Sequence, residues 1–262
     1  MQIDFEKPIT IYEAIALCIS IFWPIILSVG KWFYNKYIKK LKFTFIPTGM
    51  ITLYFDKNGS YFVMGGVYEA KCKSTTVRNI TALVERESDK AMLNLRWSTF
   101  SPAKVRVSAG NIERESEIAH PFKVESDTLF PVSIEFENAN EHIIDKFSNL
   151  LKPVHDTITF MMTQQHLLPE QVNTQIRQMP DMDRIKQLLN DNFFWRSGTY
   201  CVNLITKYND SVLYKKCKFT LSEEESGQIR NNIDNLLMEP MATYYNRWPF
   251  FATVSKEFTE IL

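Results

Sequence analysis

Hydrophobic residues form one long unbroken stretch near the start of the chain. Between Glu13 and Lys31 lie 17 residues without a charge, AIALCISIFWPIILSVG. Extended back to Ile9, the apolar segment covers the 22 residues that end at Gly30. A helix rises about 1.5 Å per residue, so about 20 residues cross a hydrocarbon core of roughly 30 Å. The pattern therefore predicts a single membrane-spanning helix over about 9–30.

The residues behind this stretch give the expected anchor a direction. The sequence KWFYNKYIKKLK combines aromatic side chains with five lysines, whereas a single lysine, Lys7, precedes the span. Lysine and arginine are enriched on the cytoplasmic side of membrane helices, and they attract anionic lipids there. We therefore expect a single-pass protein with its N-terminus outside and its C-terminal domain in the cytoplasm. The residues expected in the anchor and at its lipid interface are Trp23, Pro24, Lys31, Trp32, Tyr34, Lys36, Lys39 and Lys40.

After Pro47 the pattern changes to an alternation of apolar and polar residues, which is typical of strands with one buried face. Two short turns, Asn58-Gly59 and Asn209-Asp210, each join two alternating runs and predict hairpins. The pair Gly65-Gly66 lies inside one run and indicates a bulge or a close approach of another backbone. The expected strands are 50–55, 60–72, 75–87, 91–97, 122–126, 131–137, 198–208 and 211–220.

Three segments have the spacing of amphipathic helices instead. They are 140–165, 181–192 and 222–238. Pro153 should break or kink the first of them, because proline removes a backbone donor and clashes with the preceding turn. Ser222 precedes three glutamates, an arrangement that caps the last helix and suits its dipole.

These elements predict one transmembrane helix followed by a mainly-β (α+β) domain, an antiparallel sandwich of about seven strands. The expected division is a membrane anchor with its basic flank at 1–42 and a cytoplasmic domain at 43–262. That domain would carry a helical insertion at about 139–193 and the C-terminal helix at about 222–238. Its strand spacing is similar to that of immunoglobulin-like domains, although Cys72 is the sole cysteine in the first strands. A split into two domains near residue 139 is the alternative, weakened because a lone hairpin needs further strands or a helix.

Charge and cysteine content narrow the possible partners. The formal net charge is zero, but residues 43–262 hold 24 basic and 27 acidic side chains, a net of −3. Nucleic-acid binding needs clustered cations, so no nucleic-acid partner is expected. Four cysteines without CxxC spacing fit a reducing compartment, and one pairing, Cys201 with Cys217, stays open as an alternative.

Candidate catalytic groups are few. His142, Asp145 and His155 fall on one expected helix, but Pro153 and a spacing of 13 residues separate the two histidines. Zinc proteases instead use two histidines four residues apart around a glutamate. The chain also lacks the GxSxG and phosphate-loop motifs. We therefore expect no metal, no cofactor and no catalytic residue.

The C-terminal tail is rich in aromatic residues and lacks a helical period. It could pack on the domain, lie at the membrane interface, or receive a partner, and packing is the commonest outcome for such residues. The candidate residues for this surface are Tyr244, Tyr245, Trp248, Phe250 and Phe251.

The function that these features favour is a membrane-tethered cytoplasmic interaction or scaffold module without catalytic activity. Its partners would be membrane lipids, a protein not identified by the sequence, and a second copy bound through the membrane helix. Two alternatives stay open. One is a membrane-bound hydrolase or metal-dependent enzyme that uses the histidines and acids of 141–156. The other is an effector that acts through its transmembrane segment.

Overall fold

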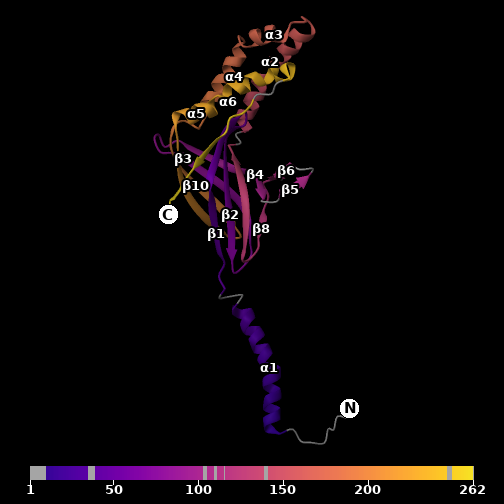
Figure 1. Cartoon of the computed structure of the whole chain (residues 1–262), viewed down its shortest axis with the longest axis vertical. Coiled ribbons are helices and arrows are strands. Elements are labelled where there is room, and N and C mark those ends of the chain that lie inside the picture. Colours follow the sequence, from indigo (N-terminus) through magenta and orange to yellow (C-terminus); the bar gives the residue numbers. More distant parts are fainter. Residues whose placement is uncertain are drawn as a thin grey trace.

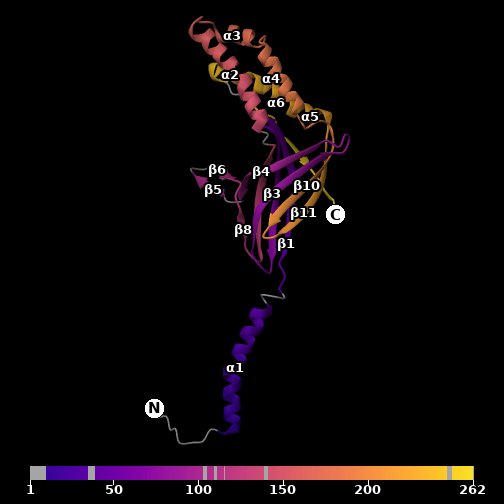
Figure 2. The same cartoon turned by 180° about the vertical axis from the view of Figure 1, so that it is seen from behind.

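One large antiparallel sheet forms the centre of the molecule, with a layer of helices at one end and a separate helix at the other (Figures 1 and 2). A computed structural model describes residues 10–34, 39–102, 105–108, 111–114, 116–138, 141–246 and 250–261. The sheet has 11 strands, and nine of them follow the order β12-β1-β2-β9-β4-β3-β10-β11-β13. They are β1 (Lys42–Asp56), β2 (Gly59–Lys71), β3 (Thr75–Arg86), β4 (Met92–Pro102), β9 (Thr128–Glu137), β10 (Gly198–Tyr208), β11 (Ser211–Leu221), β12 (Val254–Glu257) and β13 (Thr259–Ile261).

Four shorter strands complete the β structure. Two belong to the large sheet: β7 (Glu117–Ile118) pairs with β4, and β8 (Phe122–Val124) pairs with β3. The other two, β5 (Val105–Ser108) and β6 (Asn111–Arg114), form a hairpin of their own. β8 lies within the strand expected at 122–126, whereas β5, β6, β7 and the second half of β4 were missed, because no strand was expected between residues 98 and 121.

The two end strands of the sheet are neighbours in the sequence. β12 pairs with β1, and β13 pairs with β11, at the opposite end of the strand order. The chain passes from one to the other through a single residue, Phe258. The last residues of the chain therefore span the gap between β1 and β11, and the sheet is nearly closed.

Both expected hairpins are confirmed. β1 and β2 are joined at Asn58-Gly59, with Asp56 opposite Gly59. Gly59 has a φ of 123°, a conformation that glycine adopts at no steric cost, and the backbone N–H of Asn58 donates to Asp56 Oδ1 at 2.7 Å. At the second turn, Asn209 has a φ of 43° and joins β10 to β11. Asparagine tolerates this left-handed conformation better than most residues.

The glycine pair in β2 marks a close approach, as the sequence indicated. A Cβ on Gly66 would lie 2.2 Å from the ring of Phe45 on β1, so no larger residue fits while that ring stays in place. The pairing register of β1 on β2 also shifts between Pro47 and Ile51, opposite these glycines. The irregularity therefore lies in β1, while β2 runs through without a break.

The alternating residues fill the inside of the sheet with aromatic rings. Phe43 and Phe45 on β1 pack against Tyr68 on β2, with ring centroids 5.4 Å and 4.6 Å apart. Tyr68 is fully buried, and its hydroxyl lies 3.0 Å from Thr206 Oγ1 on β10, so each buried hydroxyl has a partner. These contacts join β1 and β2 to the β10–β11 hairpin across the core.

Seven α-helices and one short 3-10 helix lie in the described residues. α1 stands apart from the sheet at one end of the molecule, and the others gather at the opposite end (Figure 1). They are α1 (Ile11–Phe33), α2 (Glu141–Thr163), α3 (Pro169–Ile176), α4 (Pro180–Asp191), α5 (Glu223–Arg230), α6 (Asn232–Met238), η2 (Glu239–Met241) and α7 (Ala242–Tyr245).

The three amphipathic helices expected from the sequence are all observed, with two differences. α2 continues through Pro153 rather than ending there. The expected helix 222–238 is divided at Asn231 into α5 and α6, while Ser222 and Glu225 form the expected capping box at its start. α3 was missed, because it is only eight residues long.

A buried network joins the helical layer to the tip of the β1–β2 hairpin. Trp195 is fully buried, and its indole N–H donates to the carbonyl oxygen of Tyr54 at 3.1 Å. Asn232, at the start of α6, donates to the carbonyls of Phe55 at 3.1 Å and Ala252 at 2.9 Å. It also accepts the N–H of Ala252 at 2.7 Å. Two side chains thereby fix the helices over one end of the sheet.

The predicted immunoglobulin-like sandwich is wrong, although the mainly antiparallel β content is observed. The strands form one continuous sheet that curls until its ends nearly meet, rather than two separate sheets. β3 pairs with β4 on one side and with β10 on the other, so the last hairpin extends the same sheet. Alternation cannot separate the two folds, because either one buries one face of every strand.

The predicted membrane anchor is also wrong. Among the described residues, no helix is long and apolar enough to cross a membrane. The uncharged part of α1, between Glu13 and Lys31, has 17 residues and is about 25 Å long, shorter than a hydrocarbon core of about 30 Å. The predicted single-pass localisation and its orientation depended on this span, so they are not supported either.

Candidate functional site

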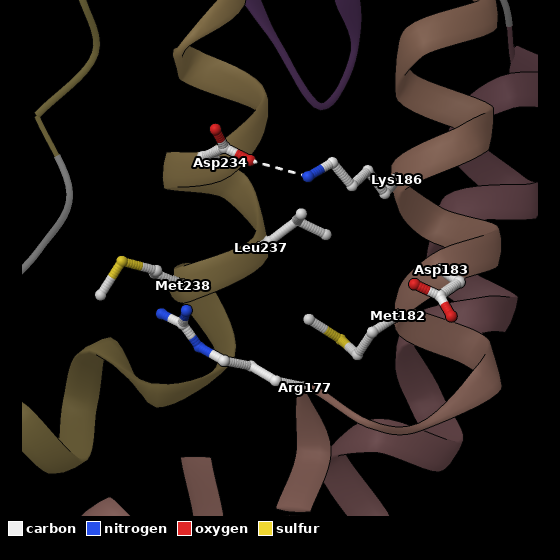
Figure 3. A pocket seen from close by; sticks show the side chains of 7 residues that line it. All are labelled: Arg177, Met182, Asp183, Lys186, Asp234, Leu237 and Met238. Atoms are coloured by element: carbon white, nitrogen blue, oxygen red, sulfur yellow. Dashed lines mark ion pairs between the residues drawn. The ribbon is translucent and has the colours of Figure 1, made fainter. Parts of the chain in front are cut away.

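A hollow in the described surface lies in the helical layer, between α4 and α6 (Figure 3). We call it the α4–α6 groove. Its volume is about 530 Å³, which is within the range of ligand and peptide pockets. It is lined by Arg177, Met182, Asp183, Lys186, Asp234, Leu237 and Met238.

Local sequence explains how the two walls are placed. α4 starts at Pro180, a residue favoured in the first turn of a helix, and its buried stripe is Met182, Ile185 and Leu189. α6 buries Ile233 and Leu236. Each helix therefore buries one face against the rest of the protein, and the part of its surface next to that face lines the groove.

Polar contacts hold the walls at a fixed separation. Lys186 Nζ on α4 lies 3.3 Å from Asp234 Oδ1 on α6, so an ion pair crosses one end of the groove (Figure 3). Beyond that end, Arg230 at the end of α5 donates to Asn190 Oδ1 on α4 at 2.6 Å and 3.2 Å. Both partners of the ion pair are largely exposed, and such pairs contribute little to stability. Their effect is to define where the groove ends.

The floor of the groove is apolar. Met182 and Leu237 extend toward each other from the two helices, and Arg177 extends from the α3–α4 connection toward Met238 (Figure 3). Met182 is almost fully buried, whereas Met238 is exposed. Methionine is flexible and polarisable, and it is frequent on surfaces that accept partners of varied shape. The groove thus combines two methionines and a leucine with two cations and two anions.

The titratable side chains of the groove are two carboxylates, a lysine and an arginine, and Lys186 and Asp234 are paired with each other. The lining residues, all within the described part of the chain, include no histidine, cysteine, serine or threonine. Nor do the described residues contain a group of three histidine, cysteine, aspartate or glutamate side chains that could hold a metal ion. The arrangement suits an apolar segment whose polar flanks can be oriented by the surrounding charges.

Among the described residues, the titratable groups with shifted pKa values lie outside the groove. Burial, hydrogen bonds and neighbouring charges cause their shifts. Burial at the tip of the β1–β2 hairpin raises the pKa of Asp56 to about 6, although the Asn58 N–H that it accepts opposes the shift. Burial likewise raises the pKa of the Cys217 thiol to about 12, which leaves this cysteine protonated and unreactive at neutral pH. The guanidinium of Arg86 lowers the pKa of Asp89 to about 2.

All four cysteines are free thiols. Cys201 and Cys217 lie on the paired strands β10 and β11, where Val202 is opposite Cys217 and Cys201 is opposite Lys218. Because Cys201 is next to Val202, the residue opposite Cys217, the two cysteine side chains point to different faces of the sheet. The disulfide that the sequence left open is therefore not formed.

The residues predicted for a metal-dependent enzyme are not assembled into a site. Asp145 and His155 lie on α2 and are exposed, and the side chain of His142 is outside the described ones. A hydrolase or metal-dependent enzyme at 141–156 stays a prediction without a structural observation in its favour.

The residues predicted for the anchor lie on or just after α1. Trp23, Pro24 and Lys31 belong to α1, which continues through Pro24, and Trp32 is one residue before its end. Tyr34 follows the helix directly, and Trp23, Trp32 and Tyr34 are all more than half exposed. Two further predicted residues, Lys39 and Lys40, precede β1, and Lys36 is outside the described residues.

The aromatic tail is divided between packing and exposure. Tyr245 is half-buried and its hydroxyl donates to the carbonyl oxygen of Pro169, at the start of α3, at 3.2 Å. Phe251 packs against the core, while Phe250 is 84% exposed. Tyr244 is exposed as well, and Trp248 is outside the described residues. The tail therefore does not form one continuous aromatic surface among its described members.

Sequence reasoning missed the groove because its walls are far apart in the chain. It placed the two walls on separate helices, 181–192 and 222–238, with no indication that the helices are neighbours. The available signal was a pair of apolar residues, Leu237 and Met238, at the end of the second helix. That signal gains meaning only once α4 and α6 lie side by side.

Comparison with known proteins gives little further guidance. No protein-family model matches the chain, and no curated protein matches it. Among solved structures, the chain is similar to a family 123 glycoside hydrolase from Clostridium perfringens, with 8% sequence identity and a TM-score of 0.31. The match covers 70% of this chain and 27% of the hydrolase. At that TM-score the likeness supports neither a shared fold nor a shared activity, and no family is assigned to the chain.

Proposed function

We propose that this chain is a non-catalytic interaction module that binds a protein partner in the α4–α6 groove. The observation that carries the proposal is the apolar floor of Met182, Leu237 and Met238 between two helices of the same layer. Grooves between two helices commonly receive an amphipathic helix, which places its apolar face on the floor. Such a helix is the partner chemistry that we propose.

The charges around the floor support a partner with polar flanks. Arg177 lies at one end of the groove, and the Lys186–Asp234 ion pair lies at the other. A bound helix would keep its polar residues near these charges, which would fix its direction and register. Charges at the rim of an interface mainly determine specificity and association rate.

Site-specific photo-crosslinking tests the proposal directly. A photoreactive amino acid replaces Met238 in the full chain, and a second variant carries it at Val212 on β11 as a matched control. Both side chains are 42% exposed, so accessibility is the same and only location differs. We expect a discrete crosslinked protein from position 238, identified by mass spectrometry, that is missing or much weaker from position 212.

A charge in the floor provides the second test. Leu237→Glu places a carboxylate on the apolar contact surface, and binding should fall by roughly tenfold or more, because desolvating an unpaired charge is costly. Leu237→Met keeps the floor apolar and should retain the partner. If both positions crosslink the same proteins, or if Leu237→Glu leaves the crosslink at position 238 unchanged, the groove is not the binding surface.

A further inference from the structure

Between Glu13 and Lys31, α1 has no charged residue, and its large apolar side chains that the structure describes are exposed. Eleven large apolar residues between Ile15 and Phe33 are each between 51% and 59% exposed. In both views the helix stands away from the sheet and the helical layer (Figures 1 and 2). A helix that is hydrophobic all round is normally buried, so this surface requires a cover that the rest of the described chain does not provide.

The apolar residues include a repeat that suits helix pairing. Ile15, Phe22 and Val29 recur every seven residues, and Cys18, Ile25 and Trp32 recur three residues later. Positions with this spacing form the seam of two-stranded coiled coils, where each side chain enters a hole on the facing helix. We call these six residues the α1 stripe.

A hollow on α1 lies beside the stripe. It is lined by Cys18, Ile19, Phe22, Trp23 and Ile26, and its volume is about 210 Å³. The small side chain of Cys18 next to the large rings of Phe22 and Trp23 creates this space. An apolar side chain of a facing helix fits such a hole.

We propose that α1 pairs with α1 of a second copy of this chain through the α1 stripe. A second copy is the favoured partner because the two surfaces match: α1 has 17 successive residues without a charge, and an identical helix offers an equally long uncharged surface. The α4–α6 groove does not offer such a surface, because two cations and two anions surround its floor. A pair formed by the same surface on both copies closes as a two-fold dimer.

The available area is sufficient for a stable pair. A side chain of this size that is half exposed offers about 100 Å², so half of the eleven side chains would bury roughly 550 Å² on each copy. The total of roughly 1,100 Å² exceeds the area of about 1,000 Å² that a specific interface requires. α1 stands away from the sheet and the helical layer, so a second helix can lie along it (Figure 1).

The native thiol of Cys18 lies on the stripe and serves as the probe. The experiment uses the full chain with Cys72→Ser and Cys201→Ser, which leaves Cys18 as the exposed thiol because Cys217 is buried. Oxidation in intact cells, followed by a non-reducing gel, reports crosslinked pairs. In a parallel pair Cys18 faces Cys18 and the band doubles in mass. In an antiparallel pair Cys18 faces position 29, so doubling appears only after Val29→Cys is added.

Two controls separate a defined interface from unspecific association. Leu27 is 56% exposed and lies on the opposite side of α1 from the stripe, so a Cys18→Ser, Leu27→Cys variant should give no doubled band. Phe22→Glu, added to the crosslinking variant, should reduce the doubled band by about tenfold or more.

Either doubled band, parallel or antiparallel, supports the pairing. Equal crosslinking from position 27 overturns the stripe as the contact surface. A crosslinked band that contains a different protein, or no crosslinked pair from either arrangement, overturns a second copy as the occupant of α1.

Discussion

Two regions of the helical layer both combine apolar and polar side chains, but one is closed by packing and the other is open. At the junction with the sheet, Trp195 and Asn232 are fully buried and every polar atom that they present has a partner. In the α4–α6 groove, apolar side chains line an open hollow and the polar groups lie at its edges. The first arrangement fixes one relative position of helices and sheet. The second leaves apolar surface available to a partner, so stability and binding are separated by about one turn of α6.

Removing the largest buried side chain of the junction should have the greatest effect. Trp195→Ala should lower the free energy of unfolding by about 3–5 kcal/mol, the usual result of leaving a large cavity in a core. Chemical denaturation measures the change. Trp195→Phe keeps most of the volume and loses the hydrogen bond to Tyr54, so it should cost about 1–2 kcal/mol. Equal losses in the two variants would show that the cavity volume is not the main cause of the lower free energy of unfolding.

The amide of Asn232 is expected to have the next largest effect. Asn232→Ala leaves the Phe55 and Ala252 carbonyls and the Ala252 N–H without their partner. We expect a loss of about 2–3 kcal/mol in the free energy of unfolding, because buried polar groups are costly when unpaired. Asn235→Ala is the control, since it removes a single exposed hydrogen bond, to the Phe250 carbonyl, and should cost less than about 1 kcal/mol. A loss at Asn232 no greater than at Asn235 would contradict a structural role for the buried network.

Asp56, at the hairpin tip beside the junction, should make stability depend on pH. Burial raises its pKa from 3.8 to about 6, so the folded chain holds this proton more tightly than the unfolded chain does. Its contribution to stability is therefore fully present below about pH 4 and is lost as the pH rises through about 6. Asp56→Asn should thus stabilise the protein at pH 7, on the order of 2 kcal/mol, and have little effect at pH 4. Denaturation of both proteins at the two pH values measures this difference, and a gain of equal size at pH 4 would contradict the burial of this carboxylate.

The groove should be the region least sensitive in stability and most sensitive in binding. Met238→Glu alters an exposed side chain, so the free energy of unfolding should change by less than about 0.5 kcal/mol. Partner binding should nevertheless fall, because the new carboxylate lies beside the apolar floor. Val212→Glu on β11 is the matched control for both measurements. A loss of binding that is the same in the two variants would remove the contrast between groove and sheet surface.

The outcome of the sequence analysis differed between local and distant features. The hairpin turns at Asn58-Gly59 and Asn209-Asp210 and the cap at Ser222 were predicted because a few neighbouring residues determine their backbone conformation. The curled sheet was not predicted, because the pairing of β3 with β10 joins segments more than 100 residues apart. Apolar alternation says which face of a strand is buried and leaves open which strand lies beside it.

The same distinction applies to the candidate sites. The uncharged stretch of α1 was evident from the sequence, but its length was judged sufficient for a membrane, which was wrong. The stretch between Glu13 and Lys31 stops short of the usual span by a few residues. The α4–α6 groove could not be predicted, since Met182 and Leu237 contribute to one surface only after the helices pack together.

The sequence by itself determined where most of the long strands and helices lie, which faces they bury, how the two hairpins turn and that α1 carries 17 successive uncharged residues. These properties depend on residues close together in the chain, whose conformational preferences act before any tertiary contact forms. Only the tertiary structure decided that the strands form one nearly closed sheet, that Trp195 and Asn232 hold the helices over its end, and that a groove opens between α4 and α6. Those features arise from packing between distant segments, which local patterns restrict but do not specify.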